Sequence, residues 1–372
     1  MIKIGLLGLG NAGGQVAALA AATAGFDAVA LNTSEKDLKT VEDRIPALVL
    51  GDEKGAGKDR ATSKEFLRAR IHDVLSSEEI LNLVEDKDVV FLITSTGGGS
   101  GSGATPALQN VLTHKFPGIR FIIIHILPML EESLAEQQNS IEFLTEQMRD
   151  DEISYLSYDN GSKNGTETKT EAMNKINHRI VEDLKVLRMD YQALTPYASM
   201  DEKDMMRILN TPGRIVVGHV AGFKEKEIDQ KDVVSRLIDD LKSAGHTELE
   251  GDRSVLRTGI IYNLNEKLYK GVQLEQLNEF IGTAVEGFEH ISLDEGENSV
   301  SLIASGLSFP DDRTEKIAQR IEELKAAITK AKGSRILGQV ETDELKALRL
   351  QDNKKVEEAS KQDIDNLMDA YF

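Results

Sequence analysis

The chain has 372 residues, of which 40% are hydrophobic and 29% are charged, and its formal net charge at pH 7 is −19. This composition is typical of a globular protein and excludes a disordered one, and the length predicts two domains or slightly more. The acidic balance argues against general affinity for nucleic acid or anionic membranes, because both require basic surfaces. Since the chain has no cysteine, disulfides, thiol catalysis and zinc–thiolate sites are excluded.

The first seven residues form a short apolar strand that runs into a glycine loop. They do not combine a charged region, a long apolar stretch and a cleavage site, so we expect no signal peptide. The longest apolar run lies near residues 121–127, is interrupted by His125, and is too short to cross a bilayer. We therefore expect a soluble, cytoplasmic protein that contacts no membrane and does not bind nucleic acid directly.

Short apolar runs alternate with longer segments of helical spacing in the first half of the chain. The apolar runs predict strands at residues 2–7, 28–31, 47–50, 89–94, 121–127 and 153–158. The segments between them predict helices at residues 12–24, 62–84, 104–115 and 131–150. Because the strands are apolar throughout, the alternation predicts an α/β fold with a parallel sheet covered on both faces. Ligands of such sheets bind at the carboxyl ends of the strands.

A long helix is predicted over residues 171–190, where Ile176, Ile180 and Leu184 fall at helical spacing after a polar loop. A second, smaller α/β domain is predicted from strands at 215–220, 255–262 and 300–304 and helices near 231–242 and 274–288. A charged helix at residues 311–332 and a tail with few large apolar residues follow. The expected division is a first domain over 1–170, a central helix and linker over 171–198, a second domain over 199–310, and a terminal helix with a mobile tail over 311–372.

A first glycine loop, residues 8–15 (GLGNAGGQ), follows the first predicted strand and opens the first helix. Glycines let a backbone approach a phosphate, and the amino end of a helix offers unpaired N–H groups and a positive dipole. The spacing GxGxxG also matches the dinucleotide fingerprint, so NAD binding is an alternative. That alternative requires an acid at the end of the second strand, whereas this strand ends near Asn32 and the nearest acid is Glu35. From this loop alone, a nucleotide site and a plain tight turn are equally open.

A second glycine loop, residues 97–103 (GGGSGSG), lies between a predicted buried strand and the next helix. Five glycines in seven positions carry a large cost in backbone entropy, which a simple connection does not require. Ser100 and Ser102 can donate to phosphate oxygens beside a nest of backbone N–H groups. Two such loops on neighbouring strands favour a nucleoside triphosphate over a dinucleotide. A Walker sequence is absent, because Lys58 is followed by an acid and not by serine or threonine.

The second loop resembles the tubulin signature GGGTGTG, with serine in place of both threonines. Residues 8–15 and the segment around Asn32 resemble the first two nucleotide loops of the tubulin/FtsZ superfamily, and the resemblance extends over about residues 1–330. The plasmid- and phage-borne TubZ branch is most similar, on residues 209–213 (LNTPG) and 304–307 (ASGL). The resemblance implies a GTP-binding first domain and a GTPase that polymerises head to tail, with GTP or GDP and Mg²⁺ as cofactors.

The resemblance also implies which residues surround the nucleotide. Lys58 would add charge near the terminal phosphate, Glu132 would hold the ribose, and two asparagines would read the base. FtsZ proteins carry an arginine four residues after this glutamate, whereas this chain has Glu136, so a basic contact is missing or supplied elsewhere. No metal ligands are identified. The implied nucleotide-binding residues are Gly10, Asn11, Gly14, Gln15, Asn32, Gly57, Lys58, Gly97, Gly98, Gly99, Ser100, Gly101, Ser102, Pro128, Glu132, Asn160 and Asn177.

Asp201 and Asp204 are the candidate catalytic residues. Their i, i+3 spacing at the start of a predicted helix places both carboxylates on one face. The segment resembles the N-x-D-x-x-D loop of FtsZ, with Ser199 in place of the asparagine. In the family this loop enters the site of the next subunit and polarises the attacking water. The plain alternative is a helix cap, because Ser199-x-x-Glu202 is a capping box and acids are favoured in a first helical turn.

The resemblance predicts a filament-forming GTPase that segregates or positions plasmid or phage DNA. The alternatives are a cell-division or cell-shape filament of the FtsZ type, a non-hydrolysing nucleotide switch and, more distantly, an NAD-dependent oxidoreductase. The main expected partner is a second copy of the chain. From residue 333 the tail has six basic and nine acidic residues, so direct DNA binding is not expected. Its last residues have helical spacing around Leu367 and could dock on a neighbouring subunit or on a DNA-bound adaptor.

Overall fold

A computed structural model describes residues 2–52, 55–147, 152–161, 167–189, 200–229, 232–243, 255–264, 272, 275–292, 298–309 and 311–335. The chain divides into two compact units, Met1–Ile321 and Glu322–Phe372. The whole sheet belongs to the first unit, and the last helix, α13 (Asp311–Arg335), crosses the boundary between the two. None of the described helices is long and apolar enough to cross a membrane.

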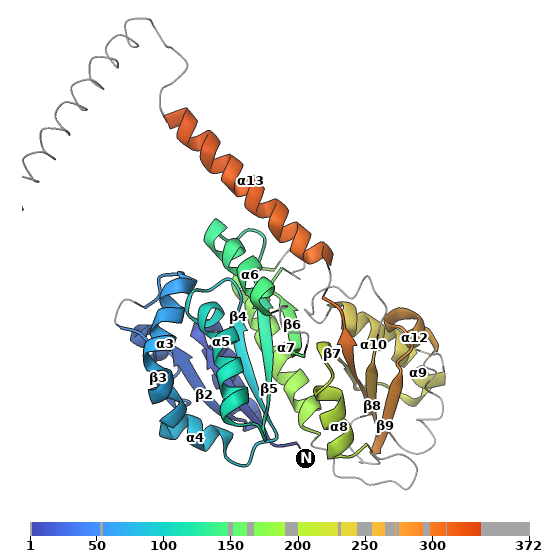
Figure 1. Cartoon of the computed structure of the whole chain (residues 1–372). Coiled ribbons are helices and arrows are strands. Elements are labelled where there is room, and N and C mark those ends of the chain that lie inside the picture. Colours follow the sequence, from blue (N-terminus) through green and yellow to red (C-terminus); the bar gives the residue numbers. More distant parts are fainter. Residues whose placement is uncertain are drawn as a thin grey trace, which may run out of the picture. The chain divides into compact units, whose positions relative to one another are not determined.

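The described strands form one sheet in the order β3-β2-β1-β4-β5-β6-β7-β10-β8-β9 (Figure 1). Pairing is parallel from β3 to β7 and between β8 and β9, whereas β10 runs antiparallel to both of its neighbours. The predicted α/β fold with a mostly parallel sheet is therefore confirmed. The strands are β1 (Ile4–Leu9), β2 (Asp27–Asn32), β3 (Ala47–Val49), β4 (Val89–Ser95), β5 (Arg120–Leu127), β6 (Ser154–Asp159), β7 (Gly213–Ala221), β8 (Arg257–Asn263), β9 (Glu286–Ser292) and β10 (Ser299–Leu307).

The predicted helices appear in order, but two of them differ from the prediction, and the short helices α2 and α9 were not predicted. The segment at 62–84 is two helices, because Ser77 ends α3 and its side chain caps α4. The helix predicted over 274–288 is wrong in its second half: α12 ends at Ile281, Gly282 follows with φ +92°, and β9 begins at Glu286. The helices before α13 are α1 (Gly10–Ala24), α2 (Glu35–Leu38), α3 (Arg60–Ser76), α4 (Glu78–Val84), α5 (Ser100–Lys115), α6 (Leu134–Gln147), α7 (Lys169–Arg188), α8 (Glu202–Leu209), α9 (Glu225–Asp229), α10 (Asp232–Ser243) and α12 (Glu275–Ile281).

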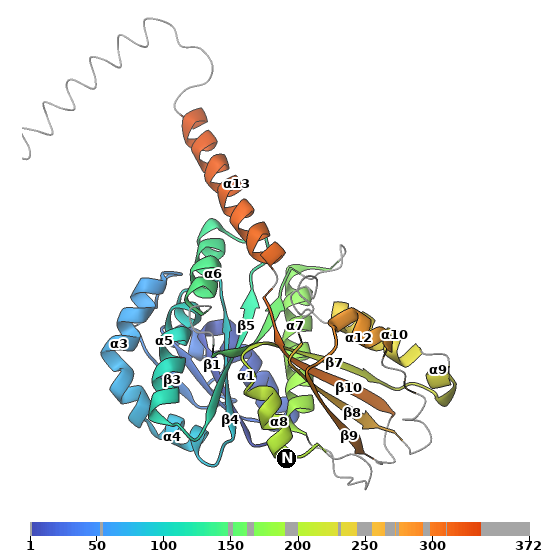
Figure 2. The ribbon, with the colours of Figure 1, turned by 45° about the vertical axis from the view of Figure 1, so that its right-hand side comes forward.

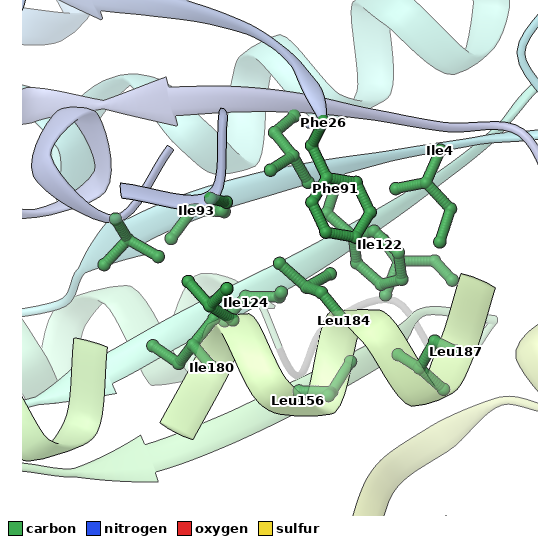
Figure 3. Packing of buried hydrophobic residues seen from close by; sticks show 14 of the residues in the cluster. Ile4, Phe26, Phe91, Ile93, Ile122, Ile124, Leu156, Ile180, Leu184 and Leu187 are labelled. Atoms are coloured by element: carbon green, nitrogen blue, oxygen red, sulfur yellow. The ribbon is translucent and has the colours of Figure 1, made fainter. Parts of the chain in front are cut away.

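The buried strands send alternate side chains into two separate cores. In β5, Ile122 and Ile124 enter the core shared with α1, α7 and α8, whereas Phe121 and Ile123 enter the core shared with α3, α4, α5 and α6. Figure 3 shows Ile122 and Ile124 facing Leu184 of α7. This two-sided burial is why the strands read as continuous apolar runs.

A third core lies among β7, β8, β9, β10, α10 and α12 and contains no residue before Val216. In Figure 2 these strands and helices form a group beside α7. The sheet joins this group to the first six strands through β6 and β7, which pair only over Ser154–Leu156 and Gly213–Ile215. The tail beyond Arg335 lies outside the described residues.

Candidate functional site

A cleft of ≈ 490 Å³ lies at the carboxyl ends of the central parallel strands, where the two glycine loops meet. We call it the glycine-loop cleft. The sequence-predicted residues that line it are Gly10, Asn11, Gly57, Lys58, Gly97, Gly98, Gly99, Ser100, Gly101, Glu132 and Asn160. The further lining residues are Leu9, Ala12, Ser34, Asp37, Gly55, Ala56, Thr94, Ser95, Glu136, Lys169 and Met173.

The two glycine loops pack against each other. Gly10 has φ +71°, and a Cβ built on it would lie 3.0 Å from the backbone nitrogen of Gly101. A Cβ on Gly101 would lie 2.5 Å from the carbonyl oxygen of Leu9 and 2.2 Å from Oγ1 of Thr94. Real Cβ atoms do not approach as closely as at Gly101, and the positive φ of Gly10 strains other residues, so both positions favour glycine.

Both loops lead directly into helices whose amino ends line the cleft. The residues that precede α1 and α5, Leu9 and Gly99, make no side-chain cap hydrogen bond. The first N–H groups of a helix have no partner within the helix, and the helix dipole places positive potential there. The cleft therefore has the backbone chemistry of an anion site, which suits the phosphates of a nucleotide.

Hydrogen bonds tie three other segments to the second glycine loop. Thr33 Oγ1 lies 2.5 Å from Ser100 Oγ and accepts from the Ala56 nitrogen at 3.0 Å. Asn139 Nδ2 donates to the carbonyl oxygens of Gly97 at 3.1 Å and Lys58 at 2.9 Å. Asn139 has no local sequence signal, since it acts only through residues far away in the chain.

Two lysine–glutamate ion pairs lie in the lining of the cleft. Lys58 Nζ lies 3.0 Å from Glu136 Oε1, and Lys169 Nζ lies 2.7 Å from Glu132 Oε1. Burial raises the pKa of Glu136, but hydrogen bonds from Ser133 and Lys58 outweigh it and hold the pKa below its usual value. The hydrogen bond to Glu132 raises the pKa of Lys169. Lys169 is therefore charged near neutral pH, and both lysines lie where their ammonium groups can meet phosphate oxygens.

Six of the implied nucleotide-binding residues do not line the cleft. Gly14 faces Ala30 and Val41, and Gln15 is hydrogen-bonded to Thr40 and Arg44. Asn32 accepts a hydrogen bond from the Ser34 nitrogen, and Ser102 donates one to the Gly98 carbonyl. The Pro128 carbonyl accepts from Arg313, and Asn177 is half-buried on α7.

The lining offers few ligands for a metal ion. Among the described residues, no group of three or more His, Asp or Glu side chains could hold one. Mg²⁺ retains several waters and is usually held by one or two carboxylates together with substrate phosphates. Glu132 and Glu136 are already paired with lysines, whereas the Asp37 carboxylate in the lining fits this limited role.

Asp201 and Asp204 lie at the opposite end of the sheet from the cleft. Helix α8 ends just before the start of β7, which pairs in parallel with the start of β6, and Figure 1 shows α8 beside the amino terminus. Asp201 Oδ1 accepts from the Asp204 nitrogen at 3.0 Å, and Asp204 Oδ2 accepts from the Asp201 nitrogen at 3.3 Å. The two acids therefore form the capping box of α8, in place of the Ser199–Glu202 pair read from the sequence; Ser199 lies outside the described residues.

Comparison with known proteins identifies the first part of the chain. Residues 3–166 match the model of the tubulin/FtsZ family, GTPase domain. The tubulin-like protein CetZ of Pyrococcus abyssi is 26% identical over 241 residues, which cover 63% of this chain and 64% of the relative. The tubulin-like protein TubZ of Clostridium botulinum C phage is 25% identical over 148 residues, 40% of this chain and 41% of the relative. The matches thus span less than two thirds of the length of these relatives.

A solved structure shows the same fold over a longer stretch. CetZ2 from Haloferax volcanii, a protofilament bound to GTPγS, covers 89% of this chain and 100% of its own chain, with a TM-score of 0.70 and 21% identity. CetZ and TubZ proteins match at similar identity, so these comparisons do not separate the two branches. Residues 3–166 are therefore similar to the GTPase domain of the tubulin/FtsZ family.

Proposed function

We propose that this chain binds GTP in the glycine-loop cleft and hydrolyses it to GDP and phosphate within a head-to-tail polymer of its own copies. The observation that carries the proposal is the separation of Asp201 from the cleft: the two lie at opposite ends of one sheet. A subunit stacked on the next in the same orientation brings the α8 end of one against the cleft of its neighbour. Such heterologous contacts form open chains.

The cleft residues have separate roles in this proposal. The amino ends of α1 and α5 hold the phosphates, and Lys58 and Lys169 supply the basic contacts that an arginine provides in FtsZ proteins. Bound Mg²⁺ would neutralise phosphate charge. Asn160 contacts the base. Glu132, which is paired with Lys169 in this structure, would accept hydrogen bonds from the ribose hydroxyls once the nucleotide is bound. We retain Asn177 as a second base contact, since it lies one helical turn beyond Met173, which lines the cleft.

The neighbouring subunit completes the site. Asp201 and Asp204 of that subunit orient the attacking water and accept a hydrogen bond from it. The water oxygen forms a bond to the γ-phosphorus as the bond to the bridging oxygen of GDP breaks, and the Asp201 carboxylate takes the proton that the water loses. In this division of labour, residues 1–170 supply most of the nucleotide site, residues 171–198 carry the central helix with Asn177 and the linker, and residues 199–310 present the acids to the next subunit.

The proposed biological role is the segregation or positioning of plasmid or phage DNA, through a DNA-bound adaptor that contacts the tail. A cell-division or cell-shape filament is the second candidate. It stays open because the CetZ and TubZ relatives are about equally similar in sequence to this chain, so the comparison does not favour the TubZ branch. The NAD-dependent alternative loses its ground, because the loop that suggested it lies inside the matched GTPase domain.

Phosphate release from GTP with Mg²⁺, measured over a wide range of protein concentration, tests the proposal. We expect turnover per subunit to be negligible below a threshold concentration and to rise above it, with polymer sedimenting at the same threshold. ATP at equal concentration serves as the control nucleotide. Turnover proportional to protein from the lowest concentration would contradict a site completed between subunits.

A further inference from the structure

An arginine of the last helix is buried beneath the wall of the glycine-loop cleft. Arg313 lies in the first turn of α13, within the first compact unit, and is 4% exposed. Its Nε lies 2.5 Å from Asp159 Oδ2, and its Nη2 lies 3.0 Å from Asp159 Oδ1. Nη2 also donates to the carbonyl oxygen of Pro128 at 2.7 Å. One guanidinium thus joins the ends of two neighbouring strands, β5 and β6.

Both acceptors precede residues of the cleft, Asp159 by one position and Pro128 by four. Asp159 is the last residue of β6, and its neighbour Asn160 lines the cleft. Asp159 Oδ1 also accepts from the Gly161 nitrogen at 2.7 Å, which fixes the turn on the other side of Asn160. Pro128 follows the end of β5 and opens the loop that carries Glu132 into the cleft.

The same helix holds the Pro128 loop at a second point. Arg320 Nε donates to the carbonyl oxygen of Leu130 at 2.9 Å. Loops at strand ends are the parts of a fold with the fewest internal constraints, so their positions depend on such ties. A planar guanidinium bound to a carboxylate through two nitrogens fixes distance and direction, which an ammonium does not.

We propose that Arg313 is a positioning residue for nucleotide recognition: it holds Asn160 and the Glu132 loop in the geometry that receives base and ribose. This inference rests on the proposed GTP binding. Arg313 does not line the cleft, so in this proposal it acts through Asp159 and Pro128 and not by touching the nucleotide. Its contribution is preorganisation, because a wall already in place costs nothing to order when the ligand binds.

Two variants test this role with the full-length protein. Arg313→Met removes the charge and leaves Asp159 buried without a cation, so it also tests whether the chain tolerates the loss. Arg313→Lys keeps the positive charge but loses the planar guanidinium that binds through two nitrogens. It replaces Arg313→Met as the test variant if Arg313→Met does not fold. The matched control is Lys325→Met on the same helix, because Lys325 pairs with Glu322 within α13.

The readouts are the dissociation constants of fluorescent GDP and ADP analogues, and the urea midpoint of the nucleotide-free protein. We expect about ten-fold weaker GDP binding for Arg313→Met, since small displacements of positioning groups have large effects. The preference for GDP over ADP should also fall, and Arg313→Lys should lie between Arg313→Met and the wild type. Lys325→Met should match the wild type in affinity and preference.

A role confined to stability would lower the urea midpoint and leave both affinity and preference unchanged in whichever variant is folded. That result, with normal GDP binding by the wild type, would overturn the positioning role alone. Failure of the wild type to bind GDP would instead overturn the proposed function, and this inference with it.

Discussion

Replacing Asp201 by asparagine separates the two roles of this residue. Asp201 Oδ1 accepts from the Asp204 nitrogen and caps α8. Asparagine and aspartate are about equally good N-caps, whereas alanine costs about 1 kcal/mol at this position. The amide oxygen of asparagine retains the acceptor, so Asp201→Asn should leave the stability of the helix nearly unchanged.

The expected catalytic effect is much larger than the effect on the cap. Loss of a positioned general base slows a reaction by about 10²- to 10⁴-fold, equivalent to roughly 3–5 kcal/mol of activation free energy. An amide can still orient a water, but it does not take a proton. We therefore expect phosphate release by Asp201→Asn to fall by about 100-fold or more.

The assay compares three properties of each variant above the threshold concentration: phosphate release from GTP, polymer sedimented with GTPγS, and the urea midpoint. Asp201→Asn should lose only the first, whereas Asp201→Ala should also lower the midpoint. Glu202→Gln, the next acid in the same turn, is the matched control and should retain turnover. Normal polymer from Asp201→Asn, with phosphate release within a few-fold of the wild type, would refute a catalytic role and leave Asp201 as a cap.

Three further predictions concern stability and assembly. Arg179→Met leaves Asp183 and Asp240 without the guanidinium that lies 2.7 Å from each, so urea unfolding should show a loss of about 3–5 kcal/mol, and a loss near zero would contradict it. Burial lowers the pKa of His125 from 6.5 to about 3, so the unfolded chain binds a proton that the folded chain does not. The free energy of unfolding should therefore fall by about 2 kcal/mol between pH 7 and 5, and His125→Gln should lack this part. Deleting residues 333–372 should leave GTP affinity unchanged and alter assembly or adaptor binding; unchanged filaments and cargo movement would refute it.

The sheet of the first half is what its sequence predicts most directly. Each of the first six strands was expected within two residues of its observed bounds. In β1 and β4, burial on both faces leaves a nearly uninterrupted apolar run. Helix α7 was expected for the opposite reason: its apolar residues recur on one side, which faces the core in Figure 3.

The second half shows where such reading fails. Residues 286–292 alternate in exposure only in their first half, and then three consecutive residues are buried. The strand β9 therefore lacks a clear alternating pattern, and no proline separates it from the preceding helix α12. Hydrophobic periodicity alone did not distinguish the strand from a continuation of the helix. The break depends on Gly282, whose positive φ is a property of the folded chain.

The cleft was predictable where function depends on the local backbone. The spacing of their glycines predicts both loops as binding loops, and the structure brings both to one cleft. Lys169, Asn139 and Arg313 were not singled out, because each acts on residues dozens of positions away through ordinary hydrogen bonds. No pattern within a window of sequence records such distant pairs.

The interlocking of the two glycine loops bears on how this motif is inherited. A Cβ added to Gly99 would lie 2.6 Å from the Lys58 backbone, and one added to Gly103 would lie 2.6 Å from the Arg60 carbonyl oxygen. A Cβ on Gly101 would clash with Leu9. None of these clashes involves a nucleotide. Selection for folding alone would therefore preserve these glycines in a descendant that had lost turnover. In a genome survey, the spacing GGGSGSG would indicate a chain that folds in this way, and under the proposed mechanism the acids of α8 would be the better guide to whether that chain still hydrolyses nucleotide.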